Sequence, residues 1–309
     1  RTRLVLGVHG SDEVSPLAPQ PCVSYVAADL GQHHDVRELL LGRALELGID
    51  TVVHGPSQQG DIDAAGRSFE RDVEATRHLL ALAEEQPRIT RFVLRSFSDV
   101  YRIERDQPAL IDEDHALDLS AGAPELTRSH VEADLTTCAK IGQSRLQIAV
   151  LRCSEILAPG LQSPLYDYLG SRLCLRPLGY DPMLNLLSLG DATDALRLAA
   201  FSHARGVLNV PGCDTLPLSD VVHLCGRWGL PLPGPLLDPL YGLRARAIGG
   251  RFRYAADRER LHYGAILDGK RARAALGYEP HSPLELAGLF SRRGRNARTG
   301  AQSGTSGSM

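Results

Sequence analysis

Apolar residues recur along the first half of the chain in two patterns that alternate. Short apolar stretches predict strands in "RLVLGVHG", "VSYVAADL", "IDTVVHG", "TRFVLRSF" and "RLQIAVLRCSEI". Apolar residues at helical spacing predict helices between them, in "DVRELLLGRALELG", "SFERDVEATRHLLALAEEQ" and "PELTRSHVEADLTTCAKIG". Strands that alternate with helices in this way are typical of a doubly wound parallel sheet. The pattern therefore predicts an α/β fold.

The pattern changes after about residue 157, where proline and glycine become frequent and the predicted elements shorten. We expect a smaller C-terminal α/β domain formed by residues 153–183 and 213–290. Residues 1–152 and 184–212 are expected to form the larger domain, because "GVLNVPG" predicts a strand that rejoins its sheet. Residues 291–309 hold glycine, serine and arginine without apolar periodicity, which predicts a disordered tail.

Composition argues against several classes of partner. The 309 residues carry a net charge of -3, so no overall positive charge favours nucleic acid. No apolar run approaches the roughly 20 residues of a membrane-spanning helix, and no membrane partner is expected. Six cysteines without paired spacing indicate free thiols in a reducing, cytoplasmic compartment. "HHD" at 33–35 predicts no metal site, because adjacent side chains diverge on a helix.

Several short stretches carry a resemblance to a known family. They are "AADL" (27–30), "DTVVH" (50–54), "DVEATRHLL" (72–80), "RFVLRSFSDVY" (91–101), "IDEDHAL" (111–117), "VLR" (150–152), "LGDATDAL" (189–196), "GVLNVPG" (206–212) and "DGKRARAALGYEP" (268–280). In order and spacing the chain resembles the extended short-chain dehydrogenase/reductases, specifically the NAD-dependent epimerase/dehydratase family of nucleotide-sugar enzymes. The resemblance implies a Rossmann-like sheet that binds NAD or NADP, a smaller substrate domain, and a nucleotide or nucleotide-sugar ligand.

One part of the family pattern is missing. The first strand and its Gly-rich turn, which hold the cofactor pyrophosphate, have no counterpart here, and "RLVLGVHG" fits the second strand better. The absent strand would lie at the centre of the sheet and pair on both sides, so its loss leaves two unpaired edges. We therefore expect that roughly 30 residues, a strand and its crossover helix, are lost before Arg1.

The resemblance also implies cofactor contacts at named positions. Asp29 and Leu30 stand where relatives place the adenine. Gly55, Pro56 and Ser57 replace the small residues that line the cofactor phosphates and ribose, and Pro56 removes one backbone donor there. An equal interpretation is that these residues are simply strand ends and turns.

The catalytic positions of the family are occupied by other residue types. The resembled enzymes use a Ser or Thr, a Tyr and a Lys, because a phenol with a pKa of about 10 needs a neighbouring cation to ionise at neutral pH. Here Phe97, Leu126 and His130 stand at those positions. A one-residue slip would offer Ser96 or Ser98, but both point to the strand face opposite residue 97. Ser96 is kept as a candidate cofactor contact.

Nothing else in the chain replaces the tyrosine and lysine pair. Lysine occurs only at Lys140 and Lys270, and neither follows a tyrosine by four residues. We therefore expect a non-catalytic protein of this family that binds a nucleotide or a partner. The alternative is an active NAD(P)-dependent nucleotide-sugar epimerase/dehydratase or reductase with relocated catalytic groups, for which His130 is the candidate base.

A third hypothesis is a scaffold that acts as a homodimer. The helices at 66–85 and 124–141 are those that relatives pack between subunits, and glutamate and arginine interleave there with Leu79, Leu80 and Val131. Burial against the protein's own sheet explains the same apolar residues equally well.

Overall fold

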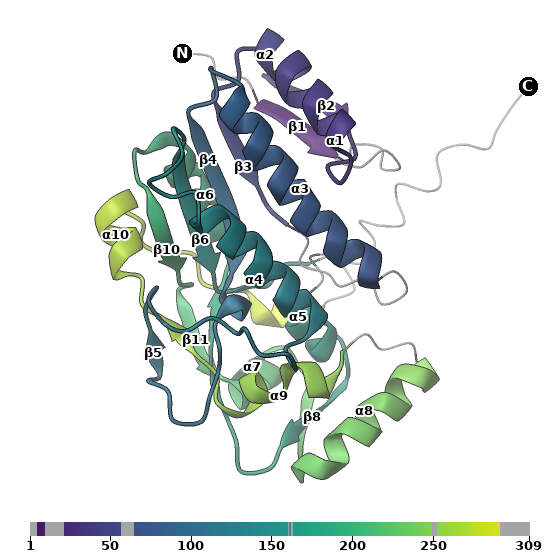
Figure 1. Ribbon diagram of the computed structural model, residues 1–309. Coiled ribbons are helices and arrows are strands. Elements are labelled where there is room, and N and C mark those ends of the chain that lie inside the picture. Colours follow the sequence, from purple (N-terminus) through teal and green to yellow (C-terminus); the bar gives the residue numbers. More distant parts are fainter. Residues whose placement is uncertain are drawn as a thin grey trace, which may run out of the picture.

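The main sheet of the computed structural model has four parallel strands in the order β10-β6-β4-β3 (Figure 1). The structure describes residues 5–9, 22–56, 65–159, 161, 163–248 and 252–290. The predicted tail at 291–309 and the candidate Ser57 lie outside these residues. Each strand of the sheet coincides with an apolar stretch of the sequence. They are β3 (Thr51–His54), β4 (Arg91–Phe97), β6 (Gln147–Cys153) and β10 (Gly206–Val210).

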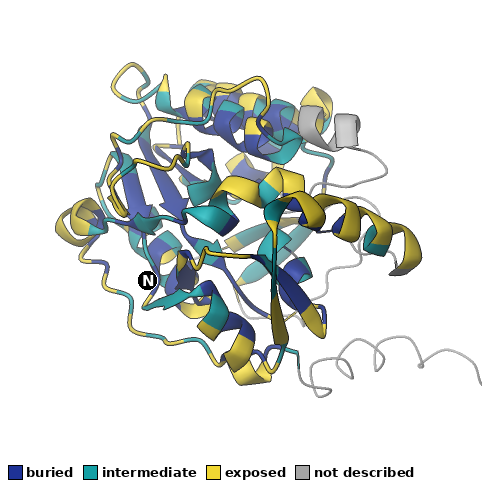
Figure 2. Ribbon diagram, turned by 90° about the horizontal axis from the view of Figure 1, so that it is seen from below, coloured by how far each residue is buried: buried dark blue, intermediate teal, exposed yellow. Residues whose placement is uncertain are grey.

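Helices cover both faces of this sheet, because successive side chains of a strand point to opposite sides. On β4, Phe92 and Leu94 pack with α3 (Ala65–Glu85), whereas Val93 packs with α6 (Leu189–Phe201). Helix α4 (Glu125–Cys138) lies along α3, and α10 (Lys270–Leu276) contacts α6. The strands are correspondingly buried between half-exposed helices in Figure 2. The prediction of a Rossmann-like, doubly wound α/β fold is confirmed.

Strands β1 (Val5–His9) and β2 (Val23–Ala27) form a separate parallel pair, at the top of Figure 1. A helical segment follows them, made of α1 (His33–Arg37), the π-helical η1 (Glu38–Arg43) and α2 (Ala44–Glu46). Within the described ranges no strand pairs with the second edge of β1 or of β3. This arrangement agrees with "RLVLGVHG" as the second strand of the family pattern.

The predicted helix at 35–48, opened by "HHD" at 33–35, is present and begins at His33. It differs from a regular α-helix in its middle, which has the wider hydrogen bonding of a π-helix. Val36, Leu39 and Leu40 still face the core beneath α3, so the burial expected from the apolar pattern is kept.

Short sheets and helices make up the C-terminal part, in the lower half of Figure 1. The strands are β7 (Glu155–Ile156), β9 (Met183–Leu187) and β11 (Asp214–Pro217) in one sheet, β8 (Leu173–Pro177) with β12 (Trp228–Leu232), and β5 (Leu110–Ile111) with β13 (Ile266–Leu267). The helices are α5 (Pro164–Leu169), α7 (Leu218–Leu224), α8 (Gly234–Ile248), α9 (Tyr254–His262) and the short turns η2 (Ser98–Val100) and η3 (Leu286–Gly288). Among all described helices, none has the length and apolar character needed to cross a membrane.

This part holds more strand than the apolar pattern predicts. Residues 218–290 suggest short helices and loops, yet β12 and β13 lie there, and α8 is 15 residues long. Both strands pair with partners that are distant in sequence, so their pairing is not visible in the local pattern. The division of the chain into two domains stays a prediction.

A buried ion pair ties α4 to the main sheet. Arg152 on β6 donates to both carboxylate oxygens of Asp134 on α4, at 2.7 and 3.0 Å. The Asp134 side chain is fully buried and that of Arg152 is only 5 % exposed. Ser96 on β4 donates to the same carboxylate at 2.6 Å, so three elements meet at one charge.

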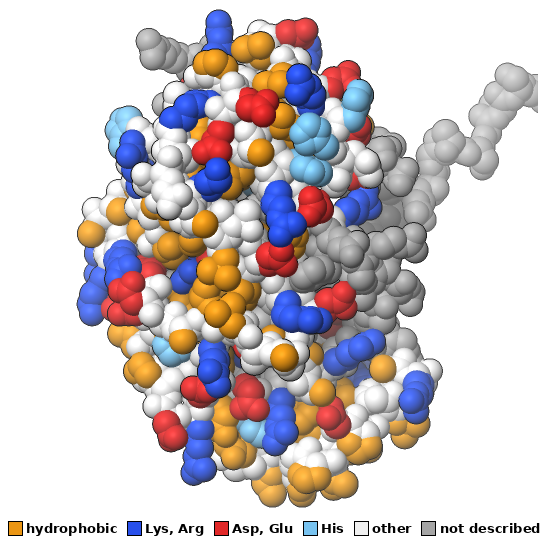
Figure 3. Space-filling view, viewed as in Figure 1, with side chains coloured by type: hydrophobic (Ala, Val, Ile, Leu, Met, Phe, Trp, Pro, Cys, Tyr) orange, Lys and Arg blue, Asp and Glu red, His pale blue; other side chains and the backbone are white. Residues whose placement is uncertain are grey.

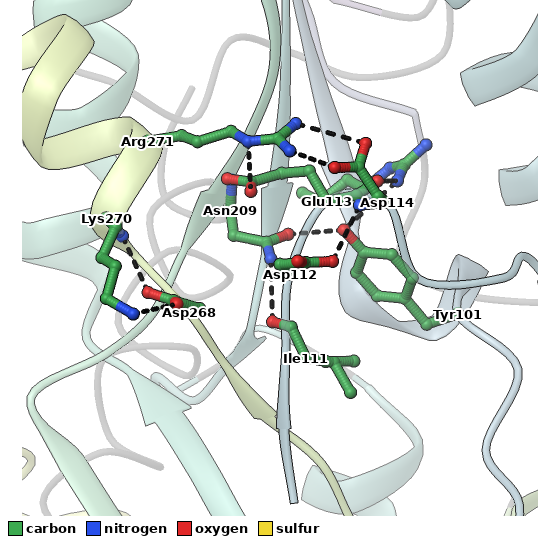
Figure 4. A network of polar contacts seen from close by, with 10 residues as sticks. Tyr101, Ile111, Asp112, Glu113, Asp114, Asn209, Asp268, Lys270 and Arg271 are labelled. Carbon is green, nitrogen blue, oxygen red and sulfur yellow. Dashed lines mark hydrogen bonds and ion pairs between the residues drawn. The ribbon is translucent and has the colours of Figure 1, made fainter. Parts of the chain in front are cut away.

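Arg152 also takes part in a polar network that reaches α10, and Figure 4 shows the part of it around Tyr101, Asn209, Glu113 and Arg271. Arg152 donates to the Tyr101 hydroxyl at 3.2 Å, and that hydroxyl donates to Oδ1 of Asn209 on β10 at 2.6 Å. The backbone N–H of Asn209 donates to Glu113 at 2.7 Å, and Glu113 forms an ion pair with Arg271 of α10 at 3.2 Å. The network therefore joins the end of β4, the segment after β5, β10 and α10.

The ion pair makes a prediction about stability. Asp134→Asn leaves Arg152 buried without a counter-charge, so we expect the free energy of unfolding to fall by about 3–5 kcal/mol in urea denaturation. Glu46→Gln is the matched control, because the Arg43–Glu46 pair is exposed, and it should cost less than about 1 kcal/mol. Equal effects of the two substitutions would contradict the account.

Candidate functional site

A pocket of about 170 Å³ opens at the carboxyl ends of β4 and β6, where the main sheet meets the C-terminal part. Ligands of open α/β sheets bind at this edge, because the loops after parallel strands converge there. Its walls come from the β4 end, the first turns of α4, the β6–β7 junction, β9, α9 and β13. The lining residues include Phe97, Asp99, Leu126, His130, Cys153, Ser154, Glu155, Leu186, Phe252, Asp257, Arg260, Leu261 and Leu267.

The three residues predicted to stand at the family's catalytic positions meet in this pocket. Phe97 ends β4, Leu126 lies in the first turn of α4, and His130 lies one turn further along the same helix. The rings of Phe97 and His130 are stacked, with centroids 3.8 Å apart and planes inclined by 19°. The three predicted positions therefore present an aromatic stack and an aliphatic side chain to the pocket.

His130 is held by Asp99 from the turn after β4. Nδ1 of His130 lies 2.8 and 2.7 Å from the two carboxylate oxygens of Asp99. Burial alone would raise the pKa of Asp99, but the nearby His130, with Arg260 and Arg95, outweighs it and lowers that pKa. Asp99 therefore stays ionised, and the orientation of the His130 ring is fixed from one side.

Neither a tyrosine nor a lysine is found among the described residues that line the pocket. Tyr101 lies nearby in sequence, but its hydroxyl is bound by Asn209 and Arg152, and burial raises its pKa to about 12. Lys140 pairs with Glu84 at 2.9 Å, and Lys270 pairs with Asp268 at 3.0 Å. Both lysines are therefore engaged away from the pocket.

The thiol in the pocket is also unsuited to proton transfer or attack. Cys153 is fully buried, and burial raises the pKa of its thiol to about 12. The described residues contain no group of three histidine, cysteine or acidic side chains placed to hold a metal ion. The described cysteines are all unpaired thiols, as predicted from their spacing.

Three charged residues of the pocket were missed by the sequence reasoning. Glu155 follows β6, and Asp257 and Arg260 lie three residues apart on one face of α9. Burial raises the pKa of Glu155, and it raises that of Asp257 to about 7 against the opposing effect of Arg260. In the sequence, "YAADRERLH" has the composition of a solvent-exposed helix, so no local signal pointed to a site.

The predicted adenine contacts lie apart from this pocket. The Asp29 carboxylate accepts from Arg71 of α3, at 2.7 and 3.3 Å, and from the N–H of Gly31 at 3.0 Å. The hydrogen bond from Arg71 is the main cause of a lowered pKa at Asp29. Leu30 packs against the core cluster beneath α3. Their role toward adenine stays a prediction.

Gly55 and Pro56, two further residues predicted to contact the cofactor, lie beside Arg95. Arg95 of β4 donates to the carbonyl of Pro56 at 2.6 Å, and its side chain lies against Gly55. The same guanidinium lies 4.3 Å from the centre of the Phe97 ring. Ser96 points away from this group, to Asp134.

On the face shown in Figure 3, lysine and arginine side chains are interspersed with aspartate and glutamate rather than gathered by sign. This face therefore lacks the basic tract that binding to a phosphate backbone requires.

The sheet order, the helices on both faces and the pocket at the strand ends are those of the extended short-chain dehydrogenase/reductase fold, the fold of NAD-dependent epimerases and dehydratases. UDP-glucose 4-epimerase of Thermotoga maritima, solved with UDP-glucose, superposes with a TM-score of 0.68 and 14% identity, covering 97% of this chain and 92% of that chain. dTDP-glucose 4,6-dehydratase of Bacillus anthracis, solved with NAD, gives 0.65 and 17%, covering 93% and 86%. At these identities the likeness establishes the fold.

Among curated proteins, the chain is similar to the uncharacterized protein Rv0501 of Mycobacterium tuberculosis and to the uncharacterized protein Mb0513 of Mycobacterium bovis. Each is 30% identical over 259 residues, which are 80% of this chain and 66% of the relative. The chain thus spans 66% of the length of the curated relatives it matches. No family model matches the chain.

The pKa of Asp257 makes a prediction about pH. Because its pKa is raised from 3.8 to about 7, the folded state binds more protons than the unfolded state between these values, and the wild-type free energy of unfolding falls as pH rises through that window. The Asp257→Asn variant has no carboxyl to ionise here and does not lose stability in this way. Its free energy of unfolding, relative to that of the wild type, should therefore rise by up to about 4 kcal/mol from acid to neutral pH. A difference that does not change with pH, in parallel urea titrations, would show that Asp257 is not held in a desolvated site.

Proposed function

We propose that this chain is a ligand-binding protein that keeps the epimerase/dehydratase fold and its substrate-side pocket without the proton-transfer chemistry. The observation that carries the proposal is the convergence of Phe97, Leu126 and His130 on one pocket whose described lining holds neither tyrosine nor lysine. Hydride transfer to or from a sugar carbon needs an acid or base at the reacting hydroxyl. A leucine and a phenyl ring cannot take that role.

On the side proposed for a dinucleotide, the described residues are engaged by neighbouring side chains. Proteins solved with this fold carry NAD, which makes NAD or NADP the candidate cofactor of the fold. In this chain, however, Asp29 is engaged by Arg71, and Arg95 lies against Gly55 and Pro56 on the side proposed for the cofactor. We therefore derive no reaction step through a nicotinamide.

One observation favours the alternative of an active NAD(P)-dependent epimerase/dehydratase or reductase. The Asp99–His130 pair has the arrangement of an oriented general base, and His130 lines the pocket. Against this stands the contact of His130 with Phe97, which occupies the position from which a substrate hydroxyl would be held. The alternative is therefore the weaker proposal, and it is open to a direct test.

The homodimer through the helices at 66–85 and 124–141 stays a proposal. In the structure α3 and α4 pack on one another, and Arg77 of α3 pairs with Glu132 of α4. Much of α4 is used within the chain, because His130, Val131 and Asp134 are buried. This favours the role of these helices in covering the protein's own sheet.

The proposed function predicts no turnover. The purified chain, incubated with UDP-glucose or dTDP-glucose and NAD or NADP, should yield neither reduced cofactor absorbance nor a new nucleotide sugar by chromatography. The Thermotoga maritima epimerase serves as the positive control for UDP-glucose. His130→Ala should leave this baseline unchanged. Turnover that is present in the wild type and lost in His130→Ala would overturn the proposal and establish the Asp99–His130 pair as catalytic.

A further inference from the structure

The body of the pocket is apolar. Phe97, Leu126, Leu186, Phe252, Leu261 and Leu267 contribute side chains to its walls. An apolar lining binds an apolar body of similar size through burial of surface from water. With a volume of about 170 Å³, the pocket suits a small molecule with a ring or a short branched chain.

Most of the acidic and basic side chains that line the pocket are carboxyls. Asp99, Glu155 and Asp257 line it, and Arg260 is the one arginine or lysine among the described lining residues. Asp99 is already paired with His130. Arg260 influences all three carboxyls electrostatically, yet it forms an ion pair with none of them in the described part of the chain. The single positive charge of Arg260 balances at most one of the two carboxylates Glu155 and Asp257. When both are ionised, the pocket therefore carries one negative charge in excess.

Two polar atoms of the pocket also lack a hydrogen-bond partner. Oε1 of Glu155 is buried, and no described residue donates to it. The neighbouring Ser154 is 4% exposed, and its hydroxyl is likewise buried without a partner. Ser163 forms a hydrogen bond with the Glu155 side chain but leaves Oε1 unpaired. Buried polar atoms of folded proteins are nearly always satisfied, so an unpaired carboxyl oxygen and an unpaired hydroxyl on two residues that line one pocket point to a ligand.

This charge pattern does not match a diphosphate. Phosphate groups are bound by arginine and lysine clusters or by backbone N–H groups at helix starts. Here a phosphate in the pocket would meet three carboxyls, one arginine and His130, which is already paired with Asp99. The negative charges of carboxylates and of a phosphate repel one another in a desolvated site.

From these observations we infer that the pocket binds a small apolar molecule that carries a protonated amino group, with the amino group against Glu155 and Asp257 and the apolar body against Phe97 and Leu126. The inference rests on the proposed function, because it assigns the ligand class of the same pocket. A protonated amine offers N–H donors to Glu155 Oε1 and supplies the missing positive charge. The Ser154 hydroxyl, which belongs to the same pocket, can accept a further hydrogen bond from the ligand.

The test compares three probes of one shape on the whole chain by calorimetry. 2-Phenylethylamine is the cation, 2-phenylethanol is neutral, and phenylacetate is the anion. We expect saturable binding of the amine, at least about tenfold tighter than that of the alcohol, and no binding of phenylacetate. Because Asp257 has a pKa of about 7, the amine should release protons at neutral pH, seen as a dependence of the heat on the buffer.

Variants assign the effect to the two carboxyls. Glu155→Gln and Asp257→Asn should each weaken binding of the amine by at least about tenfold and leave binding of the alcohol unchanged. Unchanged binding of the alcohol also shows that the pocket of the variant is still folded. Glu259→Gln is the matched control, because Glu259 is exposed on the same helix and does not line the pocket.

The inference is overturned if the amine and the alcohol bind alike, if phenylacetate binds better than the amine, or if no saturation by the amine is seen up to about 10 mM. Those results are separate from a failure of the proposed function, which would appear as turnover of a nucleotide sugar that depends on His130.

Discussion

A buried ion pair, Asp134 with Arg152, sets the position of the helix on which the pocket depends. Asp134 lies one turn beyond His130 on α4, and Ser96, which shares the carboxylate, directly precedes Phe97 on β4. The contact that anchors the helix to the sheet therefore also fixes the stack of Phe97 on His130. Because both charges are buried, neither can leave the pair without a large cost, and the spacing of helix and sheet is held firmly.

On the proposed function, this framework supports a site whose chemistry differs from that of the enzymes with this fold. In those enzymes, proton transfer needs a group whose pKa is tuned by a close partner. Here the hydroxyl of Tyr101 is held in the buried network by Asn209 and Arg152. The pocket itself holds Leu126, which cannot transfer a proton. What remains is a small apolar space with a surplus of carboxyl groups from Glu155 and Asp257. The arrangement favours recognition of a ligand over its conversion.

The fold could be predicted from the sequence to a large extent, because the strands of the main sheet and helices α3 and α4 follow two distinct apolar periods. The meeting of Phe97, Leu126 and His130 was also foreseeable, since the resemblance places all three at one site. Asp257 and Arg260 were not, because α9 has the composition of a solvent-exposed helix and lies more than a hundred residues from α4. The ion pair of Asp29 with Arg71 joins residues 42 apart, and no local pattern announces it.

The most direct test of the account is to identify what the protein retains from the cell. The full chain, purified without added ligands and then denatured, releases its bound small molecules for mass spectrometry, with Asp257→Asn purified in parallel as the control. The account predicts an apolar amine that is enriched with the wild type and reduced in the variant. Release of a nucleotide sugar or of NAD, in equal amount from both proteins, would contradict it.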